Sequence, residues 1–198
     1  MEPVKSNELL HHLREQIVAV YDKAVHRFGE QTDNILQQAP APGKWSAVQC
    51  LEHLNSYGRF YLPALENAIT TAAQKNSRPA TLFKSSWLGA WFTRLMQPTA
   101  DGQLRSRMKT PKDHLPSVQL NVTKVLEEFE AQQLKMEALL LRATEINIQQ
   151  AKVATSLSRF IKMSVGDTFG FLTAHINRHV LQAERAIAVS APLVKKLV

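Results

Sequence analysis

The sequence predicts an all-α fold, a four-helix bundle formed by a single domain that spans residues 1–198. Apolar residues recur at steps of three and four along four long segments, which is the spacing of amphipathic helices. The chain contains only seven glycines, and it shows no convincing strand pattern. A chain of 198 residues can bury a substantial core, and one domain is the natural expectation at this length.

The composition argues against two classes of protein. No apolar run approaches the eighteen or so residues of a membrane span, so we expect no membrane association, and the N-terminus lacks a hydrophobic signal region. Cys50 is the single cysteine, which excludes an intrachain disulfide and suits a reducing compartment. We therefore expect a cytoplasmic protein.

The net charge of +7 raises the question of a nucleic-acid partner, because much of the excess lies in residues 75–112. This region carries no recognisable nucleic-acid-binding motif, so no nucleic-acid partner is expected. Two interpretations of the basic residues stay open. They can form an ordinary solvated surface, or they can attract a small anionic substrate.

The first two helices are predicted over residues 6–28 and from Ser46 to about Thr71. The segment APAPG between them cannot continue a helix, because proline lacks the backbone N–H. Ser46 followed by Gln49 forms a capping-box pattern, which marks a helix start. His53 then falls on the apolar side of the second helix.

Residues 75–116 interrupt the helical pattern and carry four of the nine prolines. Within them, FKSSWLGAWFTRLM predicts a short aromatic helix, and we expect Trp87, Trp91 and Phe92 to pack it onto the body of the protein. A link of about forty residues is long for a compact domain. It can form a lid, or it can cross the full height of the bundle, for which it is long enough.

The third helix is predicted from Ser117 to about Ile146, and a connection without clean periodicity follows, which can contain a short extended piece. Ser164 and Asp167 then form a second N-terminal capping pattern, for a last helix that ends near Val189. Short connections join antiparallel neighbours, and the long crossover lies between the second and third helices. The predicted order is therefore up-down-down-up, with the second and fourth helices antiparallel.

The last helix carries His175 and His179, which lie one turn apart and so share a side. They fall on its inner side, opposite an outer side formed by Asn177, Arg178, Glu184 and Arg185. An inward-facing pair of imidazoles has two explanations. It can bind a metal ion, or it can consist of core histidines that are hydrogen-bonded to carbonyls and waters.

In the predicted topology, His53 lies within a turn or two of the level of His175 and His179. Three neutral imidazoles suit zinc, nickel or iron, and three protein ligands leave an open position of the kind found in catalytic sites. Gln182 and Glu52 are candidate partners for the imidazole N–H groups, or else ordinary surface residues. Tyr57 can line the pocket, or it can be a core tyrosine.

Two blocks of the sequence resemble the DinB-like (YfiT-type) superfamily: PGKWSAVQCLEHL and SVGDTFGFLTAHINRHVLQAERAI. The resemblance implies a four-helix bundle with up-down-down-up topology and a three-histidine metal site. Matched motif by motif, the three family histidines fall on His53, His175 and His179.

The resemblance also implies a function, because characterised members include thiol-dependent transferases and isomerases, and others are described as metal-dependent hydrolases. It suggests a divalent metal, most readily zinc or nickel, that activates a low-molecular-weight thiol or water to attack a small electrophile. The expected partners are a small-molecule substrate and a second copy of the chain in a homodimer. The alternative is a non-catalytic metal-binding or stress-related bundle protein.

Overall fold

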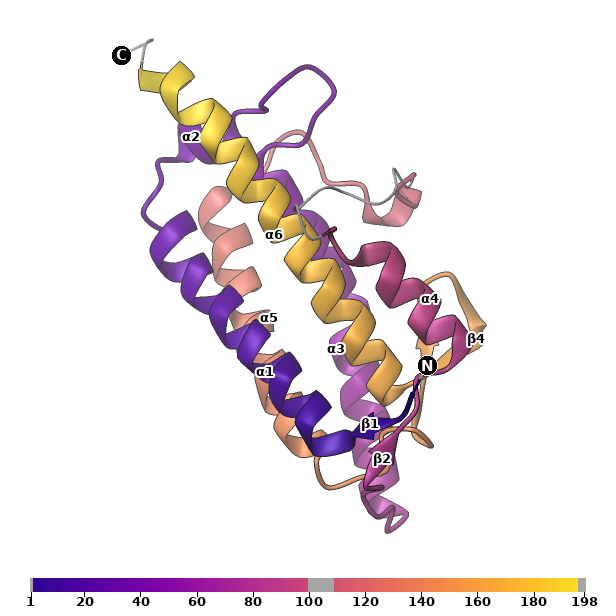
Figure 1. Cartoon of the computed structure of the whole chain (residues 1–198). Coiled ribbons are helices and arrows are strands. Elements are labelled where there is room, and N and C mark those ends of the chain that lie inside the picture. Colours follow the sequence, from indigo (N-terminus) through magenta and orange to yellow (C-terminus); the bar gives the residue numbers. More distant parts are fainter. Residues whose placement is uncertain (1, 100–108, 196–198) are drawn as a thin grey trace.

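Four long helices form the body of the protein in a computed structural model that describes residues 2–99 and 109–195 (Figure 1). Helix α3 packs against α5 and α6, and α1 packs against the same two helices. The shorter α2 and α4 flank this body, and the chain is mostly helical, as predicted. The helices are α1 (Ser6–Lys23), α2 (Asp33–Gln37), α3 (Ala47–Gln74), α4 (Trp87–Met96), α5 (Val122–Ala143) and α6 (Val165–Lys195).

Helices α3 and α5 run parallel to each other. Arg59 of α3 pairs with Glu128 of α5, and Glu66, two turns further along α3, pairs with Lys135, two turns further along α5. Parallel neighbours need a connection that returns along the bundle, and the link between α3 and α5 contains α4. Residues 100–108 of this connection lie outside the described part of the chain.

Helices α1 and α6 form a second parallel pair. Asn177 of α6 donates a hydrogen bond to Gln16 of α1 over 2.6 Å, and Glu184 pairs with Lys23 two turns further along both helices. Their shared direction brings the C-terminal halves of both helices to the same end of the bundle (Figure 1).

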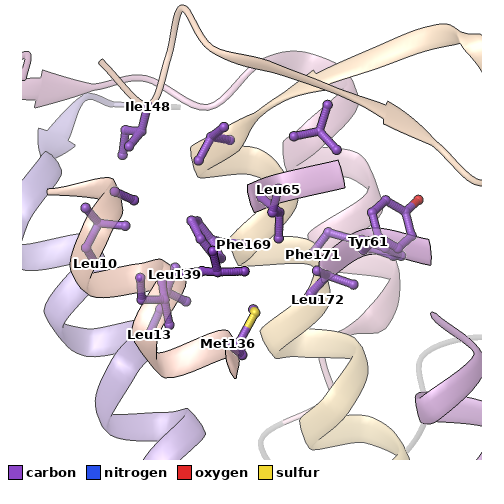
Figure 2. Packing of buried hydrophobic residues seen from close by; sticks show 14 of the residues in the cluster. Leu10, Leu13, Tyr61, Leu65, Met136, Leu139, Ile148, Phe169, Phe171 and Leu172 are labelled. Carbon is purple, nitrogen blue, oxygen red and sulfur yellow. The ribbon is translucent and has the colours of Figure 1, made fainter. Parts of the chain in front are cut away.

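Two clusters of buried apolar side chains fill the bundle, one after the other along its length. Figure 2 shows part of the first, with Leu10, Leu65, Met136 and Phe169 packed between the four long helices. The second cluster includes Phe28, Leu51, Phe129 and Val180. On α6 the first cluster contains Leu172 and the second contains Val180, so the predicted histidine pair lies where the two clusters meet.

The capping pattern at Ser46 is confirmed. Ser46 Oγ accepts a hydrogen bond from the Gln49 backbone N–H over 3.3 Å, and Gln49 Oε1 accepts one from the Ser46 N–H over 3.0 Å. This reciprocal pair fixes the start of α3. The first helix is also confirmed over residues 6–28, where a π-helical turn (Ala24–Phe28) continues α1.

Two predicted helix ends are wrong. Helix α6 continues to Lys195 rather than ending near Val189, because its last turns pack against the unpredicted α2, where Ser190 Oγ donates to the Gln38 carbonyl over 3.1 Å. The third helix begins at Val122 rather than Ser117, because the Asn121 side chain caps it by accepting from the Lys124 N–H over 2.9 Å.

Four short strands add to the helices. Strand β1 (Val4–Lys5) pairs antiparallel with β2 (Leu82–Phe83), and β3 (Lys152–Thr155) forms a hairpin with β4 (Ser158–Ser164). The hairpin lies in the connection after the third helix, where a short extended piece was an open alternative, whereas β1 and β2 were not expected. Only one side of the hairpin is buried, through Val153, Thr155 and Met163, so its apolar pattern is too short to identify a strand from the sequence.

The predicted aromatic helix is confirmed as α4, but its tryptophans do not attach it to the body. Trp87 and Trp91 are 80% and 37% exposed, whereas Phe92 is buried. At Gly89, an added Cβ would lie only 2.1 Å from Asp167 Cγ, so this glycine allows α4 to approach the start of α6.

Arg178 was expected on the outer side of the last helix, and it is instead buried, at 6% exposure. Helix α4 covers this side of α6, and an Arg178 guanidinium nitrogen donates to the Leu95 carbonyl over 3.2 Å. Burial lowers the pKa of the Arg178 guanidinium.

A buried carboxylate, Asp167, joins the segment before α4 to the first turn of α6. Its oxygens accept hydrogen bonds from the hydroxyls of Ser85, Ser86 and Ser164, and the last two measure 2.8 Å. The Ser86 N–H donates to it as well, over 3.3 Å. These hydrogen bonds replace those that the carboxylate would form with water.

We expect Asp167→Ala to lower the free energy of unfolding by about 3 kcal/mol, because it removes a buried charged acceptor and leaves the buried Ser164 hydroxyl without its partner. Urea unfolding of the variant and of a matched Asp22→Ala control, at an exposed site on α1, measures the effect. An equal, small change in both variants would show that the Asp167 network contributes little.

Candidate metal centre

His53 lies in the second turn of α3 and is 3% exposed. Its Nδ1 is 2.8 Å from the backbone carbonyl oxygen of His114. A carbonyl can only accept, so Nδ1 carries the proton and donates it. The other ring nitrogen, Nε2, then presents a lone pair toward α6.

His175 and His179 lie one turn apart on α6 and are 3% and 8% exposed. His179 Nδ1 lies 3.1 Å from Gln182 Oε1, an oxygen that can only accept. His179 is therefore also protonated on Nδ1, and its Nε2 is left with a lone pair. Gln182, which the sequence indicated as a candidate partner, lies where it orients this ring.

The three imidazoles converge on one point. His53 Nε2 and His175 Nε2 are 3.2 Å apart, and one ring nitrogen from each of His53, His175 and His179 lies within 4.8 Å of the other two. His175 Nδ1 is buried and has no hydrogen-bond partner among the described residues. Hydrogen bonding inside the cluster therefore does not account for all of its ring nitrogens.

Burial keeps all three rings neutral. Desolvation lowers the pKa of His53 to about 4, and it lowers the pKa values of His175 and His179 well below their ordinary value. Charge repulsion adds to this effect, because His179 and His53 lower the pKa of His175, and His53 lowers that of His179. Neutral imidazole is the form that binds metal, so the cluster is ready for it at neutral pH.

Aromatic rings enclose the cluster. Tyr57 meets His53 and His175 edge-on, with centroid distances of 5.1 and 4.4 Å, and Trp45 lies 4.9 Å from His53 and 5.9 Å from His179. Burial raises the pKa of the Tyr57 hydroxyl to about 12, so it stays protonated. Tyr57 thus lies beside the histidines.

Glu52 has a different partner from the one that the sequence suggested. Its carboxylate pairs with Arg59 over 2.9 Å, and Arg59 also binds Glu128 of α5. This ion pair draws Glu52 toward the α3–α5 surface. Cys50 is fully buried, and desolvation raises the pKa of its thiol, as expected for a packed side chain rather than a nucleophile.

His114 is the residue of this site that sequence reasoning missed. It ends a 3₁₀ turn (Lys112–His114), and its ring stacks on Tyr57 with centroids 3.9 Å apart. Its Nδ1 is 3.0 Å from Ser56 Oγ, and Ser56 Oγ donates to the His53 carbonyl over 2.7 Å. The residue lies in an irregular link, so no helical period pointed to it.

One large groove does not contain the cluster. It measures about 980 Å³ and lies between α1, α4 and α6, where Trp87, Trp91 and Arg94 help to line it. Residues such as Gly170 and Asn177 place it on another side of α6 from the histidines. The chemistry of the donor set, not the size of the groove, therefore identifies the candidate site.

The three histidines fit a divalent metal. Two nitrogens that bind one tetrahedral zinc at 2.0–2.1 Å lie about 3.3 Å apart, close to the His53–His175 separation. In such a site His175 would carry its proton on Nδ1. This buried nitrogen would then be a hydrogen-bond donor rather than an acceptor without a partner. Three neutral nitrogens and no carboxylate make a donor set that suits zinc or nickel.

Comparison with curated protein sequences finds no match. Among solved structures, the chain is similar to "YfiT from Bacillus subtilis", described as "a probable metal-dependent hydrolase with an unusual four-helix bundle topology". The identity is 16% and the TM-score 0.49, over 97% of this chain and 87% of that chain. A similarity this low supports no conclusion about activity.

A sequence profile of the DinB superfamily matches residues 16–183. The matched region covers most of the chain and includes His53, His175 and His179. The chain therefore belongs to the DinB superfamily.

Proposed function

We propose that His53, His175 and His179 hold a divalent metal, zinc or nickel, in an enzyme that acts on a small electrophile. One observation carries the proposal: three buried, neutral imidazoles converge, and two of them are fixed as Nδ1–H tautomers by acceptors on their outer sides. Their Nε2 lone pairs then have no better partner than a cation.

The nucleophile in this proposal is water or a low-molecular-weight thiol, and the reaction is hydrolysis or thiol transfer. When bound by three imidazoles, a divalent metal supplies Lewis acidity and lowers the pKa of a water or thiol in its remaining positions. The chain itself orients the ligands, through the His114 carbonyl and Gln182. Trp45 and Tyr57 cover the histidines and limit access of water.

The order and direction of the four long helices are part of the same proposal. The parallel pairs α1–α6 and α3–α5 support the up-down-down-up order, with residues 75–121 as the crossover. No helix in the described part of the chain combines the length and apolar character that crossing a bilayer requires. The homodimer and the cytoplasmic location stay predictions.

Metal analysis of protein purified without a nickel column tests the site. We expect about one divalent ion per chain, and a lower melting temperature after treatment with a chelator. Absence of stoichiometric metal, together with an unchanged melting temperature, would reject the metal centre.

The catalytic part is tested separately, with metal-loaded protein. Thiol conjugation to a generic electrophile and hydrolysis of activated esters are measured for the wild type and for His179→Ala. We expect activity in the wild type only. Equal rates in both would favour the non-catalytic, metal-binding alternative.

We expect Gln182→Leu to weaken zinc affinity by about 10- to 100-fold, because His179 loses the acceptor that fixes its tautomer. Competition with a coloured chelator measures the affinity. Gln74→Leu, at an exposed site near the end of α3, is the matched control and should leave the affinity unchanged. Equal affinities in both variants would show that Gln182 does not support the ligand.

A further inference from the structure

A second pocket shares a wall with the histidine cluster. It has a volume of about 120 Å³ and lies between α3, α4, α6 and the β3–β4 hairpin. The two shared side chains are Tyr57, whose ring meets His175 at 4.4 Å, and Phe171, whose ring stacks on His175 at 5.7 Å. A group held in this pocket is one aromatic side chain away from the three histidines.

The lining of the pocket is mostly aromatic and apolar. Besides Tyr57 and Phe171, it includes Tyr61, Phe92, Met96 and Met163. An enclosed apolar cavity of roughly 150 Å³ accepts one benzene molecule. The volume and the lining together favour a single planar ring or a cyclic hydrocarbon group of similar size.

One cation lies at the rim of the pocket. Lys109 is exposed and forms no ion pair with the described residues. On the hairpin side, the Ser156 N–H donates to the Tyr61 hydroxyl over 3.0 Å, and Thr155 Oγ1 donates to the Ser158 carbonyl over 3.2 Å. Lys109 is therefore the group that can interact with a charge on the ligand.

We propose that this pocket binds the ring of an aromatic or cyclic carboxylic acid, with the carboxylate at Lys109. The inference rests on the proposed function in one respect: the acid would carry, apart from its carboxylate, the electrophilic group on which the three-histidine site acts. The binding itself requires no metal, since none of the three histidines lines the pocket.

Benzoate and benzyl alcohol are the probes, titrated into metal-free protein with ¹³C-labelled methionine methyl groups. Met96 and Met163 line the pocket, and Met136 does not. We expect benzoate at millimolar concentration to shift the Met96 and Met163 resonances along one binding curve and to leave Met136 in place. Benzyl alcohol should shift the same two resonances. Absence of these shifts in folded protein overturns the pocket.

The charge is tested with Lys109→Gln and its neighbour Lys112→Gln, an exposed lysine that does not line the pocket. Lys109→Gln should weaken benzoate about threefold, the size expected for an exposed ion pair, and should not affect benzyl alcohol. Equal effects of the two substitutions on benzoate overturn the assignment of an acid. Because metal is absent throughout, the titration can succeed or fail independently of the metal analysis.

A different observation supports a second inference, about how His175 is oriented. A void of about 20 Å³ lies between α3, α5 and α6, and both His175 and Gln133 line it. His175 Nδ1 and Gln133 Oε1 are each buried without a hydrogen-bond partner among the described residues. Gln133 Nε2 donates to the Phe129 carbonyl over 3.1 Å, which leaves Oε1 as a free acceptor.

We infer that one buried water fills this void, accepting from His175 Nδ1–H and donating to Gln133 Oε1. The void is large enough for one water molecule, and it offers two polar partners. Gln133 is then a positioning residue: through the water it favours the tautomer of His175 whose Nε2 faces the proposed metal. Each of the three histidines would then be oriented by a hydrogen bond on the side of its ring that faces away from the proposed metal.

A high-resolution crystal structure tests the water directly, with or without metal. We expect density for one water within hydrogen-bond distance of both atoms, and its loss in Gln133→Met, which keeps the side-chain length. Zinc affinity should fall about tenfold in this variant. A dry void in the wild type, or unchanged zinc affinity in Gln133→Met, overturns the inference.

Discussion

Replacing His53 with alanine is expected to weaken zinc binding by more than about 100-fold, because loss of a ligand costs more than loss of the group that orients it. A metal that binds only the folded state stabilises it by about 4 kcal/mol at a concentration 1,000 times its dissociation constant. Saturating zinc should therefore raise the melting temperature of the wild type clearly, and that of His53→Ala little.

The melting temperatures of both proteins are compared with and without zinc, so any destabilisation of the metal-free variant cancels. His11→Ala, on the exposed side of α1, is the matched control and should respond to zinc as the wild type does. If His53→Ala kept the full zinc-induced shift, His53 would not be a ligand, and the hydrogen-bonded core cluster would be the better explanation of its burial.

Acidification is expected to destabilise the metal-free protein strongly. In the folded state the pKa of His53 is lowered from 6.5 to about 4, whereas the unfolded chain binds a proton near pH 6.5. Between these values the unfolded state holds more protons, so stability falls as the pH falls through this window. His53 alone accounts for roughly 2 kcal/mol between pH 7.5 and pH 5. His175 and His179 act in the same direction.

Urea unfolding at the two pH values measures this loss. The loss of stability between the two pH values should be smaller in His179→Ala. This variant lacks one imidazole that is neutral in the folded state and binds a proton in the unfolded chain. His26→Ala, at an exposed site, should leave it unchanged. Stability that is flat from pH 7.5 to pH 5 would contradict the burial of the cluster. Protons compete with metal for the same nitrogens, so the loaded protein should release its metal over this range too.

Local signals in the sequence were sufficient to predict the long helices and the three inward-facing histidines. Ser46 and Ser164 mark helix starts through hydrogen bonds that span three residues, and such bonds depend on neighbours in the chain. The helical period places His53 and the pair on α6 on buried sides. To predict that the three rings converge, only the relative direction of the second and last long helices was needed in addition.

The parts that the sequence did not predict depend on contacts between distant segments. Arg178 is buried because α4, some eighty residues earlier in the chain, covers it. His114 reaches the site from an irregular link whose path no periodicity describes. Helix α6 extends past Val189 because α2 supports its end. In each case the deciding partner lies on an element that has no fixed place until the bundle has assembled.

The distance along the chain between the converging rings has a consequence for the order of folding. His53 and His175 are 122 residues apart, and no two helices earlier in the chain bring the full donor set together. Contacts of such separation form late, because a long loop must close first. During synthesis, the metal site cannot exist until α6 has left the ribosome and docked. Bound metal would thus report a bundle in which the helices that carry the three histidines have packed together.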